Sequence, residues 1–441
     1  MSAQNVSSYP PAPAGRPDFS DFFRTFARIG CLSFGGPAGQ IALMQHELVD
    51  RRGWVDQQAF LRALNLCHLL PGPEAQQLAT WIGWRLHGTR GGLAAGLLFV
   101  LPGALVMLGL SLLYALAAGV AWFAALFLGI KAAVLAIVAQ ALLRIAGRAL
   151  GTPFKRLLAA VALIALATQA PFPVVILGAA VIGAVAGIRR PEWLALHAGP
   201  VAPALATRGS LTITTVLTVF AWLAIWAAPM ALIAVTLGPD HVLWQIGAFF
   251  SRLAVVTFGG AYAVLSYMAQ AVVENHGWLM AGEMADGLGL AETTPGPLIM
   301  VTQFVGFLAA WRDPAPFSPL LAGMLGAGLT TWVTFAPCFL WIFACAPWMD
   351  RLEQVKPLQA ALAAITAAVV GVVAHLALWF AVHVLFLRPE AEVFGLPDVT
   401  SLDWRTATIA LGAALLLFRW RRGVVEVLVA SALAGLLFAA L

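Results

Sequence analysis

The stretch Ser33-Phe34-Gly35-Gly36-Pro37 interrupts an apolar run, and it returns later in the chain as Thr257-Phe258-Gly259-Gly260. The two copies are 258 − 34 = 224 residues apart. At the same shift, Leu70-Pro71-Gly72-Pro73-Glu74 is answered by Thr294-Pro295-Gly296-Pro297-Leu298. Further identities at this shift are Arg28 with Arg252, Met44 with Met268, Gly53-Trp54 with Gly277-Trp278, and Leu64 with Leu288. So many matches in one ungapped register predict a chain built from two related halves.

The composition predicts an all-α polytopic membrane protein. Hydrophobic residues make up 61% of the 441 residues, and charged residues make up only 10%. A soluble domain carries about 45–50% apolar and about 25% charged residues, so this chain could not cover its surface with polar groups in water. The net charge of +5 comes from basic clusters between apolar runs, which orient membrane loops and do not indicate a nucleic-acid partner. The four cysteines form no CxxC pair, so neither a disulfide framework nor a metal site is expected.

Apolar runs bounded by charges, proline or glycine predict about thirteen transmembrane helices. The two halves are expected over 20–188 and 244–441, after a disordered cytoplasmic tail over 1–19. A linker over 189–243 holds one extra span, so the second half enters the membrane upside down, as an inverted-topology repeat. The two short spans within 157–188 could instead form one re-entrant hairpin. The predicted spans lie near 20–45, 57–84, 92–118, 121–143, 157–169, 172–188, 211–236, 244–272, 282–310, 317–346, 357–386, 405–418 and 423–441.

The distribution of basic residues orients these spans in a bacterial inner membrane. One predicted side collects Arg85, Arg90, Arg144, Arg148, Lys155, Arg156, Arg189, Arg190, Arg208, Arg351, Lys356, Arg419, Arg421 and Arg422. The other side carries Arg51, Arg52, Arg312 and Arg388 among Asp50, Asp56, Asp313, Glu390, Glu392 and Asp398. Because cytoplasmic loops are enriched in Lys and Arg, the first side is predicted to be cytoplasmic. The N-terminus and residue 278 are then inside, and residue 54 and the C-terminus are periplasmic.

The glycine and proline motifs predict broken helices with a binding site between them. Proline lacks an N–H and glycine permits unusual backbone angles, so both motifs split a helix. Broken backbone inside a membrane is tolerated where it is buried in protein or lines a watery cavity. A helix that starts there directs free N–H groups and a positive dipole end at a bound anion. The alternative is a set of kinks made only for packing. The candidate binding residues at the breaks are Ser33, Gly35, Gly36, Gly72, Gln76, Gln77, Thr257, Gly259, Gly260, Thr294 and Gly296.

Three cations within the apolar segments are further candidates. Arg28 and Arg252 each precede a Phe-Gly-Gly break by six residues. Buried arginines in a membrane are costly and usually functional, and two planar donor forks suit a tetrahedral dianion. The alternative is that they reach the interface or pair with a carbonyl or an acid. Lys131 is predicted either to attract the anion or to neutralise an acid, with interfacial snorkelling as its alternative.

Glu74 is the candidate for carrying a coupling proton. It begins the helix after Pro71-Gly72-Pro73, where an acid also serves as an ordinary helix cap. Asn65 and Thr293 are expected either to line the same cavity or to make helix–helix hydrogen bonds. No metalloprotease, nucleophile-elbow or P-loop motif is present, so neither an enzyme activity nor a cofactor is expected.

Three strings together resemble the chromate ion transporter family. They are Ser33-Phe-Gly-Gly-Pro-Ala-Gly-Gln-Ile-Ala-Leu-Met44, Leu69-Leu-Pro-Gly-Pro-Glu-Ala-Gln-Gln-Leu-Ala79 and Gly129-Ile-Lys-Ala-Ala-Val-Leu-Ala-Ile-Val138. The second half carries the counterparts Thr257-Phe-Gly-Gly-Ala-Tyr262 and Thr294-Pro-Gly-Pro-Leu298, which fits the long, two-domain branch of that family. The resemblance implies a secondary transporter that exports chromate and confers chromate resistance, driven by the proton-motive force.

Other functions stay open at this point. Sulfate is a tetrahedral dianion like chromate, so an importer or exchanger of sulfate or another oxyanion is the first alternative. The alternative from another class is an intramembrane enzyme or a lipid-handling protein. Beyond the substrate and the lipid bilayer, a homodimer is a further open expectation.

Overall fold

The computed structural model describes residues 17–34, 36–117, 119–194, 208–258, 261–352, 355–388, 392–393 and 396–440, nearly all of them helical. Most of the tail expected over 1–19 lies outside these residues, as do Gly35, Gly259 and Gly260. In chain order the elements, with η for 3₁₀- or π-helical turns, are α1 (Phe19–Leu32), α2 (Gly36–Gln45), η1 (His46–Arg51), α3 (Gln57–Leu69), α4 (Glu74–Ala117), α5 (Ala121–Ala149), α6 (Pro153–Ala167), α7 (Phe172–Arg189), η2 (Pro191–Leu194), α8 (Arg208–Thr236), α9 (Val242–Val256), α10 (Ala261–Gln270), η3 (Ala271–Asn275), α11 (Ala281–Thr293), η4 (Leu298–Met300), α12 (Val301–Arg312), α13 (Pro319–Cys345), η5 (Ala346–Trp348), α14 (Met349–Leu352), α15 (Lys356–Leu385), β1 (Glu392–Val393), β2 (Leu396–Pro397), η6 (Val399–Ser401), α16 (Trp404–Ala414), η7 (Leu415–Arg419) and α17 (Val424–Ala440).

Helix ends recur at the spacing of the sequence repeat. Helix α1 ends at Leu32 and α9 ends at Val256, which is 32 + 224 = 256. Helix α3 ends at Leu69 and α11 at Thr293, again 224 residues later. Both α2 and α10 run into a π-helical turn, and the glycines that follow, Gly53 and Gly277, share a positive φ of 62°. The same local sequence thus produces the same backbone path in both halves.

The segment 282–310 folds back on itself, although the sequence predicts a single span there. Arg312, at the end of α12, donates to the Trp278 carbonyl at 2.6 Å and pairs with Glu283 at 2.5 Å. Trp278 and Glu283 lie at the start of α11, and each helix is about 20 Å long at 1.5 Å per residue. A straight path would therefore separate these groups by about 40 Å. The chain reverses at Pro295-Gly296-Pro297, so both ends of the segment lie on one side.

The other three segments that carry a break are folded back in the same way. Arg52, after η1, pairs with Asp21 in the first turn of α1 at 2.9 Å. His87 packs against the α1 residues Phe19 and Phe22, with ring centroids 5.3 and 4.8 Å apart. In the second half the His276 ring, after η3, lies 5.3 Å from Phe249 in α9. Arg52, just before α3, and His87, at the end of the first part of α4, both contact the first turn of α1, so the two ends of the segment 57–84 lie together. The single spans expected over 20–45, 57–84 and 244–272 are therefore hairpins as well.

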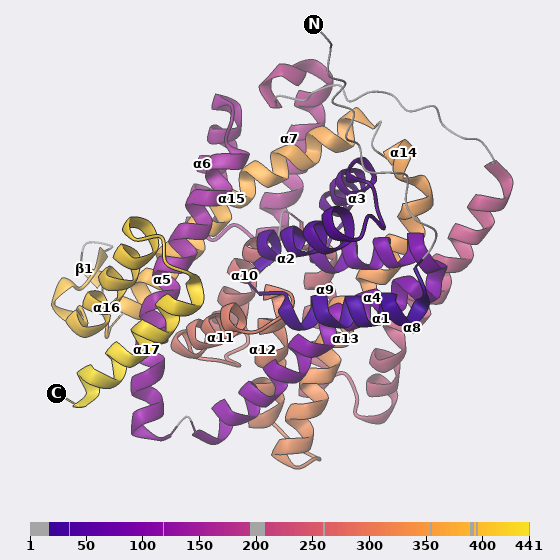
Figure 1. Cartoon of the computed structure of the whole chain (residues 1–441). Helices are drawn as coiled ribbons and strands as arrows, with labels where there is room; N and C mark the ends of the chain where they lie inside the picture. Colours follow the sequence, from indigo (N-terminus) through magenta and orange to yellow (C-terminus); the bar gives the residue numbers. More distant parts are fainter. Residues whose placement is uncertain are drawn as a thin grey trace, which may run out of the picture.

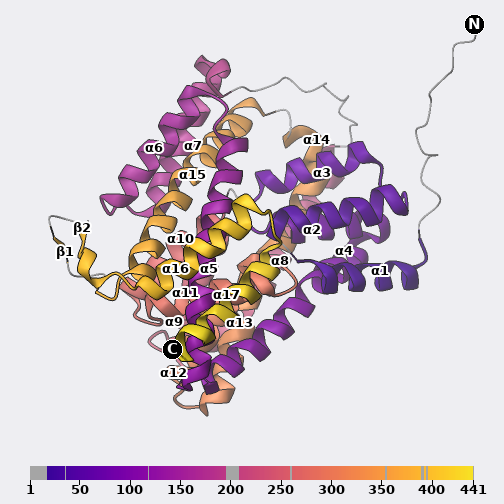
Figure 2. The same ribbon diagram turned by 60° about the vertical axis from the view of Figure 1, so that its left-hand side comes forward.

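We call α1–α2 and α9–α10 the FGG hairpins. The PGP hairpins are α3 with residues 74–86 of α4, and α11 with α12. Helix α4 leaves its hairpin at His87 and Gly88, whose non-helical angles separate the hairpin part from a long crossing part over 89–117. Figure 2 shows α1, α2, α3 and the start of α4 gathered on the right of the molecule, away from α6, α7 and the β1–β2 pair.

The long helices connect the two halves by crossing over. Helix α5 of the first half packs against α16 and α17, and α15 of the second half packs against α6 and α7, as Figure 1 shows. Small residues permit this contact, because a Cβ added at Gly129 would overlap the Ser431 carbonyl and one at Gly371 would overlap the Ala159 carbonyl. Such small residues let helix backbones approach closely inside a membrane.

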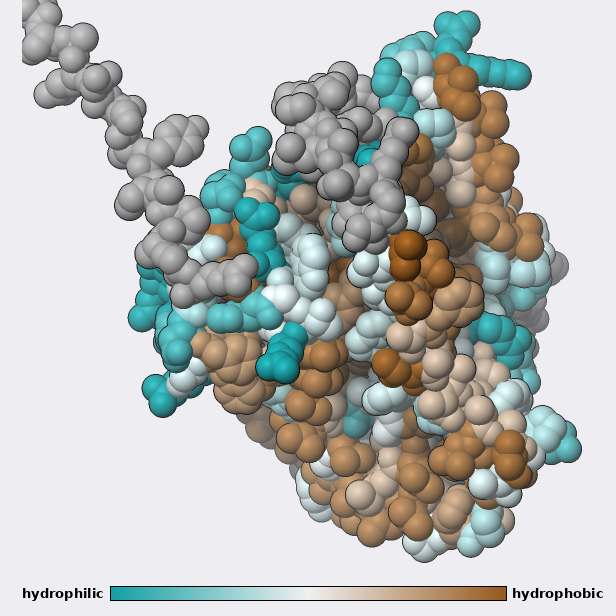
Figure 3. All heavy atoms as spheres, turned by 90° about the vertical axis from the view of Figure 1, so that its right-hand side faces the viewer, coloured by the Kyte–Doolittle hydropathy of each residue, from teal (hydrophilic) through white to brown (hydrophobic). Residues whose placement is uncertain are grey.

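The exterior is apolar, as a lipid-facing surface must be. In the part of the chain that the structure describes, 6 helices are long and apolar enough to cross a membrane. Helix α8 shows the pattern most fully, because none of its most apolar 18-residue window is buried. It is tied to α13 by indole hydrogen bonds, including one from Trp226 to the Val333 carbonyl at 3.2 Å. Figure 3 shows a continuous apolar area in the lower part of one face, with polar residues gathered above it.

Candidate functional site

The breaks of the four hairpins are joined in pairs across the two halves. The Gly72 N–H donates to the Thr257 carbonyl at 2.8 Å, and the Gly296 N–H donates to the Ser33 carbonyl at 2.8 Å. These two bonds are equivalent under the 224-residue repeat, since 33 + 224 = 257 and 72 + 224 = 296. Each PGP break of one half is thus fastened to the FGG break of the other half.

Glycine is required where these breaks meet. Gly72 has a φ of 120° and Gly296 a φ of 95°, in the left-handed region that L side chains rarely adopt. The crossing part of α4 also touches the tip of the second half, because a Cβ added at Gly103 would overlap the Pro295 carbonyl. In the second half, α13 contacts the tip of the first half in the same way, because the Sγ of its Cys338 lies 2.9 Å from a Cβ built at Gly72.

The hydroxyl groups at the breaks serve their own helices. Ser33 Oγ donates to the Ile29 carbonyl at 2.7 Å, and Thr257 Oγ1 donates to the Leu253 carbonyl at 2.6 Å. Thr294 Oγ1 donates to the Leu290 carbonyl at 2.7 Å, and Thr293 Oγ1 donates to the same carbonyl at 2.8 Å. Each hydroxyl proton is committed to the backbone, while the oxygen keeps acceptor capacity.

Helix ends of both polarities meet at the breaks. Helices α2, α4 and α10 and the η4–α12 segment begin there, so their first-turn N–H groups have no acceptor within their own helix. These N-terminal ends carry partial positive charge and suit an anion. Helices α1, α3, α9 and α11 end there, and the carbonyls of Ser33 and Thr257 are occupied by the reciprocal bonds.

Buried glutamines fill the space around the breaks. Gln77 Nε2 donates to the Pro71 carbonyl at 2.7 Å, and Gln303 Nε2 donates to the Ala104 carbonyl at 2.9 Å. Gln40 Nε2 reaches the Gly296 carbonyl. The amide oxygens of Gln40, Gln76, Gln77 and Gln303 are buried without a hydrogen-bond partner. Such groups are costly when left unpaired, which indicates a place for water or another donor. Gln40 was not among the predicted site residues; its signal is an amide side chain in the middle of the apolar helix that follows the first break.

The structure brings only part of the predicted set to this place. Gly36, Gly72, Gln76, Gln77 and Gly296 lie at the breaks, together with the serine and threonines described above. Asn65 is exposed on α3, and Glu74 is half-buried in the first turn of α4.

Arg28 and Arg252 lie on exposed faces of α1 and α9, where the sequence predicts burial. The interior face of α1 is instead built from apolar side chains such as Phe22, Phe26 and Ile29. Arg252 Nε donates to the Ala248 carbonyl one turn earlier, at 3.1 Å. The two arginines therefore keep equivalent positions in the repeat, on the outer faces of the two FGG hairpins.

Lys131 neutralises an acid, which is one of the two roles that the sequence predicts for it. Its Nζ lies 3.2 Å from Asp286 Oδ2, and Tyr114 donates to the same oxygen at 2.7 Å. Asp286 is 2% exposed, and its second oxygen, Oδ1, is buried without a partner. The three side chains come from α5, α11 and α4, so this pair ties the first half to the second. Asp286 was not among the predicted site residues; its signal is an acid between Glu283 and Glu292 in one apolar segment.

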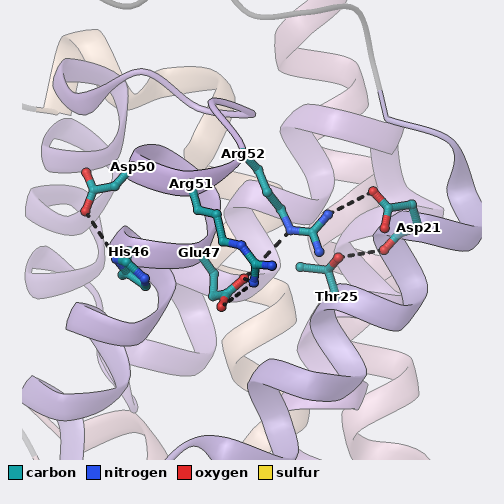
Figure 4. Close-up of polar contacts among 7 residues, drawn as sticks. All are labelled: Asp21, Thr25, His46, Glu47, Asp50, Arg51 and Arg52. Carbon is teal, nitrogen blue, oxygen red and sulfur yellow. Dashed lines mark hydrogen bonds and ion pairs between the residues drawn. The ribbon is translucent and has the colours of Figure 1, made fainter.

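A polar cluster closes the outer end of the first FGG hairpin (Figure 4). Arg51 and Arg52 both contact the largely buried Glu47, at 3.2 and 3.8 Å. Arg52 also reaches Asp21, and its guanidinium carbon lies 4.9 Å from the centre of the Trp54 ring. In the second half, Arg312 and Glu283 close the outer end of the PGP hairpin instead. Among the described residues, no group of three or more His, Cys, Asp and Glu is arranged to hold a metal ion.

Comparison with known proteins identifies the family. The family model described as chromate transporter matches residues 20–184 and 244–436, one stretch in each half. The chain belongs to the chromate transporter family. It is 33% identical to the chromate transport protein of Pseudomonas aeruginosa over 99% of this chain and 98% of that protein. The chromate transport protein of Cupriavidus metallidurans is 27% identical, over 92% of this chain and 90% of its own length. No solved structure matches the chain.

Proposed function

We propose that this protein is a secondary transporter that exports chromate across the bacterial inner membrane and thereby confers chromate resistance. The observation that carries the proposal is the meeting of four helix breaks, fastened in reciprocal pairs between the halves. Secondary transporters place the substrate site where broken helices of inverted repeats meet near the midplane, with helix N-termini directed at an anionic substrate. Membership of the chromate transporter family supports chromate as the anion.

The proposed topology differs from the one expected from hydropathy alone. The four hairpins are re-entrant, the first-half pair entering from the cytoplasm and the second-half pair from the periplasm. This assignment moves Arg51 and Arg52 to the cytoplasmic side with the other basic loops, so it satisfies the positive-inside rule better. The N-terminus stays cytoplasmic and the C-terminus periplasmic. Reporter fusions should place residue 54 inside and residue 278 outside, and finding both on one side would exclude inverted halves.

Arg28 and Arg252 are proposed to line two aqueous entrances to the central site, one on each side. Arg28 lies about 14 Å along α1 from its first residue, toward the helix break, and we place it inside the membrane. A charged side chain at that depth must face water or protein, because lipid does not solvate it. Nearby Cys31 is an exposed free thiol, and its repeat equivalent is Val255, since 31 + 224 = 255.

Thiol labelling tests these entrances directly. With the other cysteines replaced, a membrane-impermeant thiosulfonate should modify Cys31 from the cytoplasmic side. In a Cys31→Ser background, Val255→Cys should react from the periplasmic side instead. Protection of both positions in intact membranes would place these faces in lipid or protein and exclude the entrances.

The central site is proposed to bind the dianion mainly through the backbone N–H groups of the helices that begin at the breaks, because the hydroxyl protons there are already donated to carbonyls. The residues proposed to surround the site are Ser33, Gly35, Gly36, Asn65, Gly72, Gln76, Gln77, Thr257, Gly259, Gly260, Thr293, Thr294 and Gly296, with Arg28 and Arg252 supplying positive charge and Lys131 balancing Asp286. Glu74 is the proposed carrier of a coupling proton. The membrane potential itself favours expulsion of a dianion, by about 2.3 kcal/mol per charge per 100 mV, so the proton-motive force can act through its electrical part.

Labelled chromate uptake into inside-out vesicles tests the proposal as a whole. Accumulation that requires the protein and collapses with an uncoupler is the expected result. Sulfate in excess should compete, because amide donors read charge and oxygen spacing, which the two anions share. Protein-dependent sulfate movement without any chromate movement would replace the proposed function by the alternative, a sulfate transporter.

A further inference from the structure

A groove lies at the end of α5, far along the chain from the helix breaks. Its volume is about 490 Å³, and it lies between α5 and the turn that joins η7 to α17. Of its eight lining residues, three are arginines and none is acidic. The lining residues are Gln140, Arg144, Leu417, Phe418, Arg421, Arg422, Gly423 and Val424. Arg422 is paired with Glu426 at 3.7 Å, so the uncompensated positive charge of the groove comes from Arg144 and Arg421, and the electrostatics favour an anion between these two.

The backbone of the turn presents these cations in a fixed way. The N–H of Trp420 donates to the Leu415 carbonyl at 3.2 Å, and the N–H of Arg422 donates to the Leu416 carbonyl at 3.0 Å. Between them Arg421 takes a φ of 53°, a left-handed conformation that is uncommon for a side chain of this size. On the α5 side of the groove, the Arg144 guanidinium donates a hydrogen bond to the Gln140 amide oxygen at 3.3 Å.

The rim of the groove is apolar and exposed. Phe418, which lines the groove, is 44% exposed, and Leu143 and Trp420, the chain neighbours of the lining residues Arg144 and Arg421, are 62% and 61% exposed. Helix α5 is long and apolar enough to cross a membrane, and Arg144 lies in its last two turns. A tryptophan beside arginines at the end of such a helix is typical of the boundary between acyl chains and headgroups.

We propose that this groove binds the phosphate headgroup of an anionic phospholipid, with the acyl chains lying against the apolar rim. Basic pockets between transmembrane helices on the cytoplasmic side are suited to such headgroups. Planar guanidinium groups match phosphate oxygens with two parallel hydrogen bonds, which favours arginine over lysine here. The apolar rim favours a lipid over a free phosphate ester, because only the lipid covers it. The site is separate from the anion path and does not depend on it.

The test compares two double variants of equal charge. Arg144→Gln with Arg421→Gln removes two groove cations, whereas Arg148→Gln with Arg419→Gln removes two exposed arginines just outside it, from α5 and from η7. Purified protein in a neutral detergent is titrated with phosphatidylglycerol or phosphatidylcholine and followed by native mass spectrometry and thermal unfolding. Only phosphatidylglycerol should bind and raise the unfolding temperature. The groove variant should weaken this binding by roughly tenfold or more, and the control variant should not.

Three results would overturn the proposal. If both double variants weaken phosphatidylglycerol binding equally, the binding depends only on the net charge of the protein and not on the groove. If phosphatidylcholine binds as tightly as phosphatidylglycerol, the groove does not recognise the anionic headgroup. Full competition by glycerol phosphate or inorganic phosphate at millimolar concentration would make the groove a site for a soluble phosphate. If the groove variant unfolds without lipid, Arg421→Gln alone is compared with Arg419→Gln by the same titration.

Discussion

The two PGP hairpins share a backbone but differ in side-chain chemistry. Both reverse at a Pro-Gly-Pro whose glycine N–H bonds to the other half, and both end at a basic side chain, the half-buried His87 in the first and the exposed Arg312 in the second. After the first break come Glu74, Gln76 and Gln77, whereas the repeat positions after the second break hold Leu298, Met300 and Val301. In the helix before the break, the acid lies in the second half instead: Asp286 of α11 aligns with Arg62 of α3, since 62 + 224 = 286.

This difference suggests a division of labour over a symmetric frame. The frame of helix ends and reciprocal bonds is common to both halves and supplies the backbone donors. The first half adds polar side chains at the break, and the second half adds a buried acid that the first half neutralises through Lys131. Such an arrangement favours one shared site over one site per half.

The largest expected effect comes from the two repeat-related arginines. If both entrances serve one site, Arg28→Ala and Arg252→Ala should each abolish chromate resistance while the protein remains in the membrane. Arg24→Ala, on the same exposed face of α1, is the matched control and should retain resistance. Growth on chromate and membrane protein levels measure the outcome. Loss in Arg28→Ala alone would assign the function to one half, and wild-type resistance in both would remove the arginines from the path.

The ion pair between the halves should behave as a unit. Lys131→Met leaves the Asp286 carboxylate, 2% exposed, buried without its cation, which typically costs about 3–5 kcal/mol; Asp286→Asn leaves Lys131, which is 28% exposed, and should cost less. The double variant removes both charges and should restore most of the stability. Thermal unfolding in detergent measures the difference. Additive losses in the double variant would show that the two side chains do not stabilise each other.

The contact between the crossing helix and the second PGP break should be sensitive to one methyl group. Gly103→Ala would force a Cβ onto the Pro295 carbonyl, and overpacking of this kind costs about 1–3 kcal/mol. Gly109→Ala, in the same helix with nothing within 4 Å of the added Cβ, should be neutral or slightly stabilising. If Gly103→Ala lowers the unfolding temperature no more than Gly109→Ala does, the close approach of Gly103 to Pro295 is contradicted.

The sequence predicted the family and the breaks at the glycine and proline motifs, but not the direction of the chain after each break. A Pro-Gly-Pro ends a helix through local sterics, and that effect is readable from Pro71-Gly72-Pro73 alone. Whether the next helix continues or returns depends on distant contacts, such as Arg312 with Trp278. The pair of Lys131 with Asp286 joins positions 286 − 131 = 155 residues apart, so no local pattern predicts it.

The smallest expected effect concerns Glu74, whose repeat partner is Leu298. Glu74→Gln keeps the shape and the capping oxygen but cannot exchange a proton, so we expect folding and downhill chromate exchange to persist. If Glu74 carries the coupling proton, the pH dependence of energised uptake into inside-out vesicles should flatten. Leu298→Glu places the same acid at the equivalent break of the second half and asks whether position or chemistry matters. An unchanged pH profile in Glu74→Gln would leave this residue a helix cap, and the asymmetry between the two breaks would then rest on Gln76 and Gln77.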